Sequence, residues 1–260
     1  MGSGPRIRVG CCGFSTARSI YFRTLPVVEI QQTFYQPPQP CTIEGWRAEA
    51  PDGFEFTLKA WQLITHEASS PTYRRLKQRL RDIDRPKVGS FRWTDLTQRA
   101  WQTTREAARL LNARKVVFQC PASFRPTDEN KDRMREFFSR IPRLNLTCIW
   151  EPRGTWLDDD IRALCEELDL IHCVDAFKAS PATVPQKGSE LRYYRLHGPT
   201  GKSASYSDPE LKWLAGLAAE TEGHAYFMFN NIRMFEDARR FQEMLAEGLE
   251  PAAGPQPVVE

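Results

Sequence analysis

The stretch Phe54-Glu-Phe-Thr-Leu-Lys59 alternates apolar and polar residues and ends on a lysine. A period of two is typical of a β-strand, so the three apolar side chains share one face while Glu55, Thr57 and Lys59 share the other. Seven further short apolar runs occur along the chain, and most of them also end in a charged or amide residue. They are Ile7–Cys11, Val27–Gln31, Lys115–Gln119, Leu146–Glu151, Leu170–Asp175, Arg192–His197 and Ala225–Asn230.

Several segments between these runs have helical character. Asp208 and Pro209 are typical of a helix start, as N-cap and first-turn residue, and predict a helix that continues to Ala219. Further helices are predicted over Trp101–Asn112, Asp128–Arg140, Asp158–Leu168 and Asp237–Glu247. Eight strands that alternate with helices predict an α/β fold, a TIM-like (β/α)8 barrel, whose active sites lie at the carboxyl ends of the strands.

The chain length agrees with this fold. Its 260 residues are close to the roughly 250 residues of a single barrel. No linker rich in Pro, Gly or Ser divides the middle, so we expect one domain over residues 5–247. Residues 61–114, between the third and fourth strands, form an insert that begins at the carboxyl end of a strand and is expected beside the site. Residues 248–260 are rich in Pro, Gly and Ala and are expected to be disordered.

The composition excludes several classes of protein. The net charge of +3 is too small to indicate nucleic-acid binding unless basic residues are clustered. The 7 cysteines include no C-x-x-C pair and no zinc-finger spacing, which indicates reduced thiols in a cytoplasmic protein. No apolar segment is long enough to span a bilayer, so we expect no membrane partner. The oligomeric state is not specified by any of these features.

Polar residues lie at the points where the predicted strands end. In a barrel, inward side chains stack in layers, and the last of them lies at the mouth. The inward polar residues near these ends are Glu29, Gln31, Lys59, Gln119, Glu151, Arg153, Asp175, Arg195, His197 and Asn230. Isolated buried charges are costly, so such a set pairs internally or meets a ligand. It is therefore either an enzyme site or a structural network of ion pairs.

The basic residues of this set predict an anionic ligand. Arg153 and Arg195 carry planar guanidinium groups that match carboxylate or phosphate oxygens. Lys59 would also bind an anion, or act as an amine nucleophile if its surroundings lower its pKa. We therefore expect a small phosphorylated or carboxylated substrate. The further residues expected to bind it are Glu29, Gln31, Gln119 and Asn230.

The acidic residues and one histidine predict proton transfer. Glu151 and His197 are the natural general base and general acid, because neighbouring charges can bring their pKa values towards neutrality. Asp175 is a third catalytic candidate, and together with Glu151 it would permit glycosidase-like chemistry at a suitable separation. Hydrolase, lyase and isomerase reactions all fit this set. His66, beyond the third strand, is expected to be a loop or structural residue.

The same residues raise the alternative of a metal site. Three of the inward carboxylates together with His197 would supply enough ligands for a divalent ion. Only one of these ligands is a histidine, however, and the lysine and two arginines predicted at the same mouth would repel a cation. We therefore expect no metal or other cofactor and keep a divalent ion as the alternative.

Aromatic residues near the strand ends have two interpretations. Tyr35 and Trp156 are expected to stack on a substrate ring at the rim, with Phe34, Trp61 and Trp93 nearby. In the alternative, they plug the core under the loops. Position along the sequence favours the rim only slightly.

Two cysteines, Cys11 and Cys12, end the first strand. One of them would be a reactive thiol if nearby Lys or Arg side chains lowered its pKa. The alternative is a small buried residue, which is the usual state of cysteine.

Residues 74–87 contain 7 basic side chains and 2 acidic ones. Helical spacing would place Arg74, Lys77 and Arg81 on one face, with the apolar residues of the segment towards the core. Such a face is either merely solvated or a contact for the phosphates of a nucleic acid, extended by Arg92 and Arg99.

Six short motifs follow one another at the strand ends. They are Val-Glu-Ile-Gln-Gln-Thr-Phe-Tyr (28–35), Lys-Ala-Trp-Gln-Leu-Ile-Thr-His (59–66), Phe-Gln-Cys-Pro-Ala-Ser-Phe (118–124), Trp-Glu-Pro-Arg-Gly-Thr-Trp (150–156), Tyr-Arg-Leu-His-Gly (194–198) and Phe-Asn-Asn (229–231). In this series the chain resembles the YecE-like family, domain of unknown function 72, from Val9 to about Glu247. The resemblance implies a TIM-like barrel and no agreed activity. Gly10-Cys-Cys-Gly-Phe14 and the Glu-Pro-Arg-Gly motif resemble an archaeal-type branch of that family.

Three hypotheses about function follow. The leading one is an enzyme that acts on a small anionic substrate by general acid–base chemistry at the mouth of the barrel. The second is a barrel that binds or processes nucleic acid through the basic segment 74–87. The third is a binding module without catalytic activity, in which the charges at the mouth pair with one another.

Overall fold

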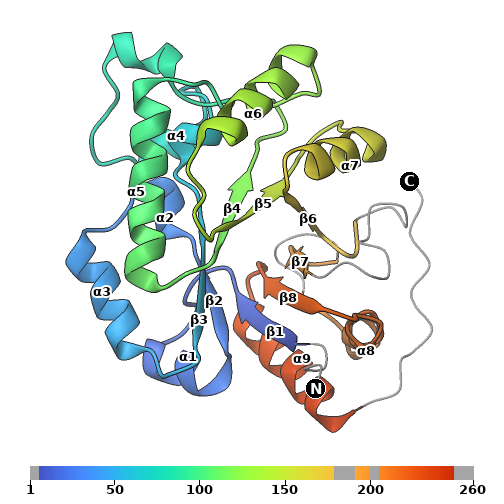
Figure 1. Ribbon diagram of the computed structural model, residues 1–260. Coiled ribbons are helices and arrows are strands. Elements are labelled where there is room, and N and C mark those ends of the chain that lie inside the picture. Colours follow the sequence, from blue (N-terminus) through green and yellow to red (C-terminus); the bar gives the residue numbers. More distant parts are fainter. Residues whose placement is uncertain (1–5, 179–190, 200–204, 249–260) are drawn as a thin grey trace. The chain divides into compact units, whose positions relative to one another are not determined.

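The computed structural model describes residues 6–178, 191–199 and 205–248. Eight parallel strands, labelled in Figure 1, pair in a closed barrel whose strand order follows the sequence. The strands are β1 (Arg6–Cys11), β2 (Val27–Ile30), β3 (Glu55–Lys59), β4 (Lys115–Gln119), β5 (Thr147–Glu151), β6 (Ile171–Val174), β7 (Leu191–Leu196) and β8 (His224–Phe229). Each apolar run contributes one strand, so the predicted TIM-like barrel is confirmed.

In the described part of the chain, helices lie between most consecutive strands. They are α1 (Arg18–Thr24), α2 (Gln32–Tyr35), α3 (Pro40–Glu49), α4 (Gln62–Thr65), α5 (Asp95–Leu111), α6 (Asp128–Arg140), α7 (Asp158–Glu167), α8 (Asp208–Ala219) and α9 (Met234–Glu247). Two short 3-10 helices, η1 (Pro71–Arg75) and η2 (Asp82–Lys87), lie in the insert after β3. The helix predicted over Asp128–Arg140 has the bounds of α6. Of the tail predicted for residues 248–260, all but Gly248 lies outside the described residues.

Three helices, α5, α8 and α9, begin earlier than predicted, and in α5 and α8 the reason is an unrecognised capping residue. Helix α5 begins at Asp95, where Thr94 and Thr97 each accept a backbone N–H of the other in a capping box. Helix α8 has Ser207 as its N-cap rather than Asp208, which is the first residue inside the helix. Both caps satisfy amide groups that a helix start would otherwise leave without partners.

The prediction of a single helix over the basic segment 74–87 is wrong. The segment forms parts of η1 and η2, and residues 76–81 between them are not helical. Pro86 lies inside η2, and a proline has no backbone N–H with which to continue an α-helix. Ile83 was expected to face the core together with Leu76 and Leu80, yet it is 67% exposed. The leucines are half-buried.

The chain is divided into two compact units. The first unit comprises Met1–Glu29, Asp52–Phe54 and Cys173–Glu260, and the second comprises Ile30–Pro51 and Glu55–His172. Strands β1, β7 and β8 pair with one another in the first unit, and β3, β4 and β5 pair in the second. Each unit is described below by itself.

Alternating side chains of the second unit separate an apolar face from a polar one. In β4, Phe118 packs against Phe138 and Trp101, with ring centroids 5.1 and 5.7 Å away. Its neighbour Gln119 therefore points to the opposite face of the strand. The backbone register pairs Gln119 with Glu151 of β5, so these two side chains share that face.

The first unit shows the same division in β7. Tyr194 stacks on Phe227 of β8, with ring centroids 4.8 Å apart, and is fully buried. The alternation then places Tyr193 and Arg195 on the other face, where Tyr193 stacks on Tyr226 at 5.6 Å. Packing of aromatic side chains thus determines which residues of β7 remain for polar contacts.

Candidate functional site

Three consecutive strands of the second unit end in polar residues that contact one another. The Lys59 ammonium group, at the end of β3, donates to Oε1 of Gln119 at the end of β4, at 2.5 Å. Nε2 of Gln119 donates in turn to Oε1 of Glu151 at the end of β5, at 3.5 Å. All three residues are buried, and we call them, together with Arg153, the β3–β5 polar cluster.

Arg153 is the member of this cluster that solvent reaches. Its Nη2 atom lies 3.1 Å from Oε1 of Glu151, and its side chain is 40% exposed, against 8% for that of Glu151. The loop that presents it continues through Gly154 at φ +93°, a conformation that favours glycine. A Cβ atom at Gly154 would lie 2.8 Å from the carbonyl oxygen of Ala122, so a larger residue would displace this loop.

The Lys59 side chain is held by residues of the second unit besides Gln119. Its ammonium group lies 3.8 Å from the centroid of the Phe34 ring, which is a cation–π contact. The backbone carbonyl of Lys59 accepts the hydroxyl of Thr33 at 2.7 Å. These contacts fix Lys59 at the carboxyl end of β3, and its role in binding or catalysis stays a prediction.

His66 lies close enough to this cluster for their charges to interact. Burial lowers its pKa to about 3, and the positive charges of Lys59 and Arg153 contribute in the same direction, while Glu151 opposes them. Its ring packs edge-on against Phe34, with centroids 4.9 Å apart, and its Nδ1 contacts the Thr65 hydroxyl at 2.8 Å. His66 is therefore neutral at pH 7. The sequence predicts a loop or structural residue at this position, which ends the motif that Lys59 begins.

In the first unit, Arg195 and Glu29 form a buried ion pair. Nη2 of Arg195 lies 3.1 Å from Oε1 of Glu29, and the two side chains are 1% and 0% exposed. The hydroxyl of Tyr193 donates to the other oxygen of Glu29 at 2.8 Å. The two residues were predicted to bind substrate. Their mutual contact and complete burial fit the alternative prediction of a structural ion pair better.

A second polar pair of the first unit joins the ends of β6 and β7. Oδ2 of Asp175 accepts the backbone N–H of His197 at 3.1 Å and lies 3.1 Å from its Nδ1. Lys178 adds a cation 3.7 Å from the same oxygen. A carboxylate at Nδ1 holds a histidine ring in place and favours the tautomer whose Nε2 accepts a proton. Asp175 thus fixes the orientation of the His197 ring, and the proton-transfer role of His197 stays a prediction.

The structure places the other predicted binding residues as follows. Gln31 is half-buried at the N-cap of α2. Asn230 follows β8, and its backbone N–H donates to the carbonyl of Leu196 at 2.7 Å. Tyr35 is half-buried, with the Arg75 guanidinium 4.3 Å from its ring centroid. None of these contacts involves the β3–β5 polar cluster.

Trp156 belongs to the core rather than to an exposed rim. It is 8% exposed and its ring contacts Trp150 and Phe124, with centroids 4.9 and 5.7 Å apart. Its Nε1 donates to the carbonyl of Phe124 at 2.8 Å. An indole packed on two aromatic rings, with its N–H bonded, fits the alternative prediction of a core plug.

The two cysteines at the end of β1 are buried. Burial raises the pKa of the Cys11 thiol to about 12, whereas a reactive thiol requires a lowered pKa. Its Sγ atom lies 3.4 Å from the carbonyl oxygen of Met234, and Sγ of Cys12 lies 3.9 Å from that of Met228. These surroundings favour the interpretation of both residues as small buried side chains.

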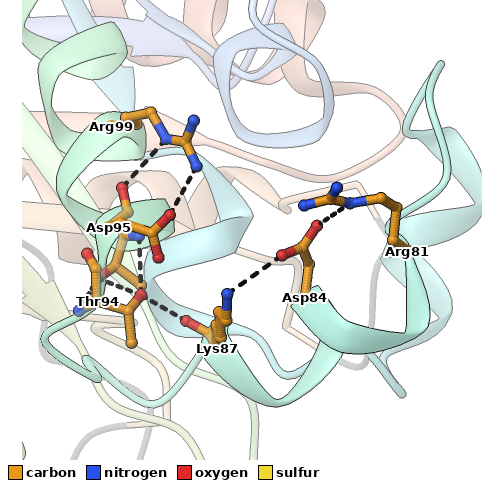
Figure 2. Close-up of polar contacts among 7 residues, drawn as sticks. Arg81, Asp84, Lys87, Thr94, Asp95 and Arg99 are labelled. Atoms are coloured by element: carbon orange, nitrogen blue, oxygen red, sulfur yellow. Dashed lines mark hydrogen bonds and ion pairs between the residues drawn. The ribbon is translucent and has the colours of Figure 1, made fainter.

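Many basic residues of the insert are exposed, and some of them are paired. Arg74, Lys77 and Arg81 are all exposed, but they do not share the face of a helix as predicted. Figure 2 shows Asp84 between Arg81 and Lys87, at 2.6 and 3.5 Å from their nitrogen atoms. Carboxylates of the insert thus hold some of its cations in place.

Two further features of the described part of the chain concern metal binding and membrane-spanning helices. There, no three His, Cys, Asp or Glu side chains are grouped as a metal site would require. Within the same residues, every helix falls short of the length and apolar character needed to cross a membrane.

Solved structures with the same fold include two from one family. A DUF72 family protein from Enterococcus faecalis is 18% identical, with a TM-score of 0.68, and the match covers 93% of this chain and 98% of that one. A DUF72 family protein from Thermotoga maritima is 19% identical, with a TM-score of 0.66 and coverages of 93% and 99%. Endonuclease IV from Thermus thermophilus is 11% identical, with a TM-score of 0.52 and coverages of 94% and 100%. At these identities the similarity shows the fold alone.

Sequence comparison supplies the family. No curated protein matches the chain. The sequence profile of the family described as "Protein of unknown function DUF72" matches residues 13–258. Since this match extends over most of the chain, the protein belongs to the DUF72 family.

Proposed function

We propose that this protein is an enzyme that acts on a small anionic substrate, phosphorylated or carboxylated, at the β3–β5 polar cluster. One observation carries the proposal. A nearly buried carboxylate, Glu151, contacts a guanidinium group, Arg153, that is 40% exposed. Polar residues at the carboxyl ends of barrel strands usually serve chemistry, and here an acid–base group lies next to an accessible cation.

Arg153 and Lys59 supply the positive charge for binding in this proposal. The exposed guanidinium of Arg153 is suited to two oxygens of a carboxylate or phosphate. The ammonium of Lys59, positioned by Phe34 and Gln119, contributes a fixed charge at the end of β3. A cation placed before the substrate arrives stabilises negative charge that develops during the reaction.

Glu151 transfers the proton. Its Oε1 atom is contacted by both Gln119 and Arg153, which hold the carboxylate in one orientation. Neutral His66 lies close enough to interact with Lys59, Arg153 and Glu151, and it adds no positive charge of its own. In the first unit, His197 oriented by Asp175 is a second proton-transfer candidate. The loss of kcat in His197→Gln tests it.

The test replaces the carboxylate and keeps the shape of the side chain. Wild-type protein and Glu151→Gln are assayed on a panel of phosphomonoesters, phosphodiesters and carboxylated glycosides. Because general acid–base groups contribute about 10²- to 10⁴-fold to rates, kcat on the accepted substrate is expected to fall by that factor. KM should change little, since Arg153 is retained.

A matched control removes a carboxylate that is paired elsewhere on the second unit. Glu136 on α6 also lies 3.1 Å from an arginine, Arg140, but both side chains are about half-exposed. Glu136→Gln should retain wild-type kcat. Equal activity in Glu151→Gln and wild-type protein would refute the proposal. Binding of inorganic phosphate through Arg153 without turnover of any panel member would instead identify a binding module.

A further inference from the structure

A groove in the insert combines an apolar wall with a basic rim. Its volume is about 560 Å³, and it lies among α4, α5 and the non-helical residues 76–81. The backbone N–H of Lys77 donates to Oε1 of Gln36 at 3.2 Å, which ties this segment to the end of α2. The groove shares no lining residue with the β3–β5 polar cluster.

The rim carries an excess of positive charge. Among the described residues that line the groove, Lys77, Arg79, Arg81 and Arg99 are basic, and Asp84 is the single acidic one. Arg81 pairs with Asp84 at 2.6 Å, and Arg99 pairs with a carboxylate outside the lining at 2.8 Å (Figure 2). Lys77 and Arg79 are exposed and form no ion pair with any residue that the structure describes.

The wall beneath this rim is apolar and includes one aromatic side chain. Trp61 lines the groove with four leucines contributed by α4, α5 and residues 76–81: Leu63, Leu76, Leu80 and Leu96. The backbone N–H of Trp61 is bonded to the Thr104 hydroxyl at 3.2 Å. Its indole Nε1, by contrast, has no hydrogen-bond partner within the described part of the chain. A buried donor without an acceptor is uncommon, and this nitrogen is enclosed by protein, so the groove meets other atoms of Trp61.

We infer that this groove binds a nucleotide unit. The aromatic base lies against Trp61 and the leucines, and the phosphate meets Lys77 and Arg79. A purely solvated basic face would need neither the hollow nor the apolar wall. Stacking of a base on an aromatic residue together with cations along the phosphate is the usual arrangement for single-stranded nucleic acid. The same chemistry fits a free mononucleotide, so the experiment includes both sources. This inference goes beyond the proposed function, because the cluster at the strand ends takes no part in it.

Binding is measured with three probes on the full chain carrying Arg153→Ala, so that an anion held at the β3–β5 polar cluster does not contribute. A fluorescein-labelled 12-nucleotide single strand is followed by anisotropy, and adenosine monophosphate and inorganic phosphate by calorimetry. The expected result is binding of the oligonucleotide, the mononucleotide or both, and much weaker binding of inorganic phosphate. Binding of the oligonucleotide alone would identify the source as a nucleic acid. Equal affinities for mononucleotide and phosphate, or no binding of any probe, would overturn the inference.

The double variant Lys77→Ala/Arg79→Ala tests the rim. We expect its affinity for the oligonucleotide to fall at least tenfold, and the slope of log K against log salt to lose about 1.4, because each phosphate contact on a single strand contributes about 0.7. The matched control is Arg74→Ala/Arg85→Ala, which removes the same charge from exposed residues of the same segment outside the groove. An equal loss in both double variants would show a general electrostatic attraction and overturn the site.

Trp61→Phe tests the wall without removing an aromatic ring. The variant lacks the indole N–H and part of the stacking surface, and we expect a several-fold loss of affinity for the mononucleotide or oligonucleotide that binds. Circular dichroism checks that the variant is folded. Unchanged affinity in the folded variant would contradict the assignment of the base to this wall.

Discussion

Two glutamate–arginine pairs near the strand ends, Glu29–Arg195 and Glu151–Arg153, share one contact distance and differ in their surroundings. In each pair an arginine Nη2 lies 3.1 Å from a glutamate Oε1. Glu29 and Arg195 of the first unit are 0% and 1% exposed, whereas Glu151 and Arg153 of the second unit are 8% and 40% exposed. The length of a contact therefore does not tell a structural ion pair from one that a solute can reach. Exposure of the arginine does.

The physical reason lies in the cost of removing charges from water. A fully buried pair has lost its hydration, so each charge depends on its partner and on neighbouring hydrogen bonds such as that from Tyr193 to Glu29. A pair with one exposed member keeps water on that side, and its attraction is screened. A fully buried pair stabilises the fold once it has formed. A pair with an exposed arginine can exchange the contact within the pair for a contact with a ligand.

The largest expected effect is on the buried pair. Arg195→Met leaves Glu29 buried without its cation, and the free energy of unfolding is expected to fall by about 3–5 kcal/mol. Urea unfolding measures the change. The double variant Glu29→Leu/Arg195→Met removes both charges and should regain much of the loss, since apolar replacements of a buried pair are often neutral. A single variant as stable as wild-type protein would show that this pair is not the structural one.

A smaller effect concerns the pH dependence of stability. The pKa of His66 is about 3 in the folded protein, below the usual value of 6.5, so the unfolded chain binds more protons in between. Stability due to neutral His66 is thus present above pH 6.5 and is lost as the pH falls towards 3, at up to about 1.4 kcal/mol per pH unit. Urea unfolding at pH 7 and pH 5 should show a smaller loss in His66→Gln than in wild-type protein.

His172 contributes in the same direction, because burial lowers its pKa to about 4, so the variant is expected to remove only part of the pH dependence. His224→Gln is the control, since His224 is exposed. An identical pH dependence in His66→Gln and wild-type protein would show that burial and the neighbouring cations do not lower the pKa of His66. With that result, His66 would give no information about the charges around Glu151 and Arg153.

The smallest effect on stability is expected for the exposed partner. Arg153→Ala should lower the free energy of unfolding by only about 0–1 kcal/mol, because its charge is largely screened by solvent. Calorimetry with inorganic phosphate should nevertheless show a clear loss of affinity if Arg153 holds the anion. A stability loss as large as that of Arg195→Met would mean that both pairs are structural.

The strands and the facing of their polar residues follow from local pattern. The alternation in Phe54–Lys59 predicts that Lys59 turns away from the apolar face, and the structure joins it to Gln119. The same rule brings Gln119 and Glu151 together. These predictions succeed because a period of two is a property of a few consecutive residues.

Other features depend on contacts between distant residues. Ile83 is exposed where a helical stripe predicted burial, because residues 74–87 do not form one helix. Trp156 is buried by Trp150 and Phe124, which the order of motifs does not reveal. The low pKa of His66 arises from burial and from Lys59 and Arg153, and local sequence carries no measure of either.

By itself, the sequence determined the eight strands, their alternation with helices, the membership of the family and the polar residues at the strand ends. Each of these rests on residue order and short-range periodicity. Only the tertiary structure decided which glutamate–arginine pair is buried and which is exposed, that the basic segment lines a groove, and that His66 is neutral. Burial and electrostatic surroundings are set by segments far apart in the chain, and so they exist only once the chain has folded.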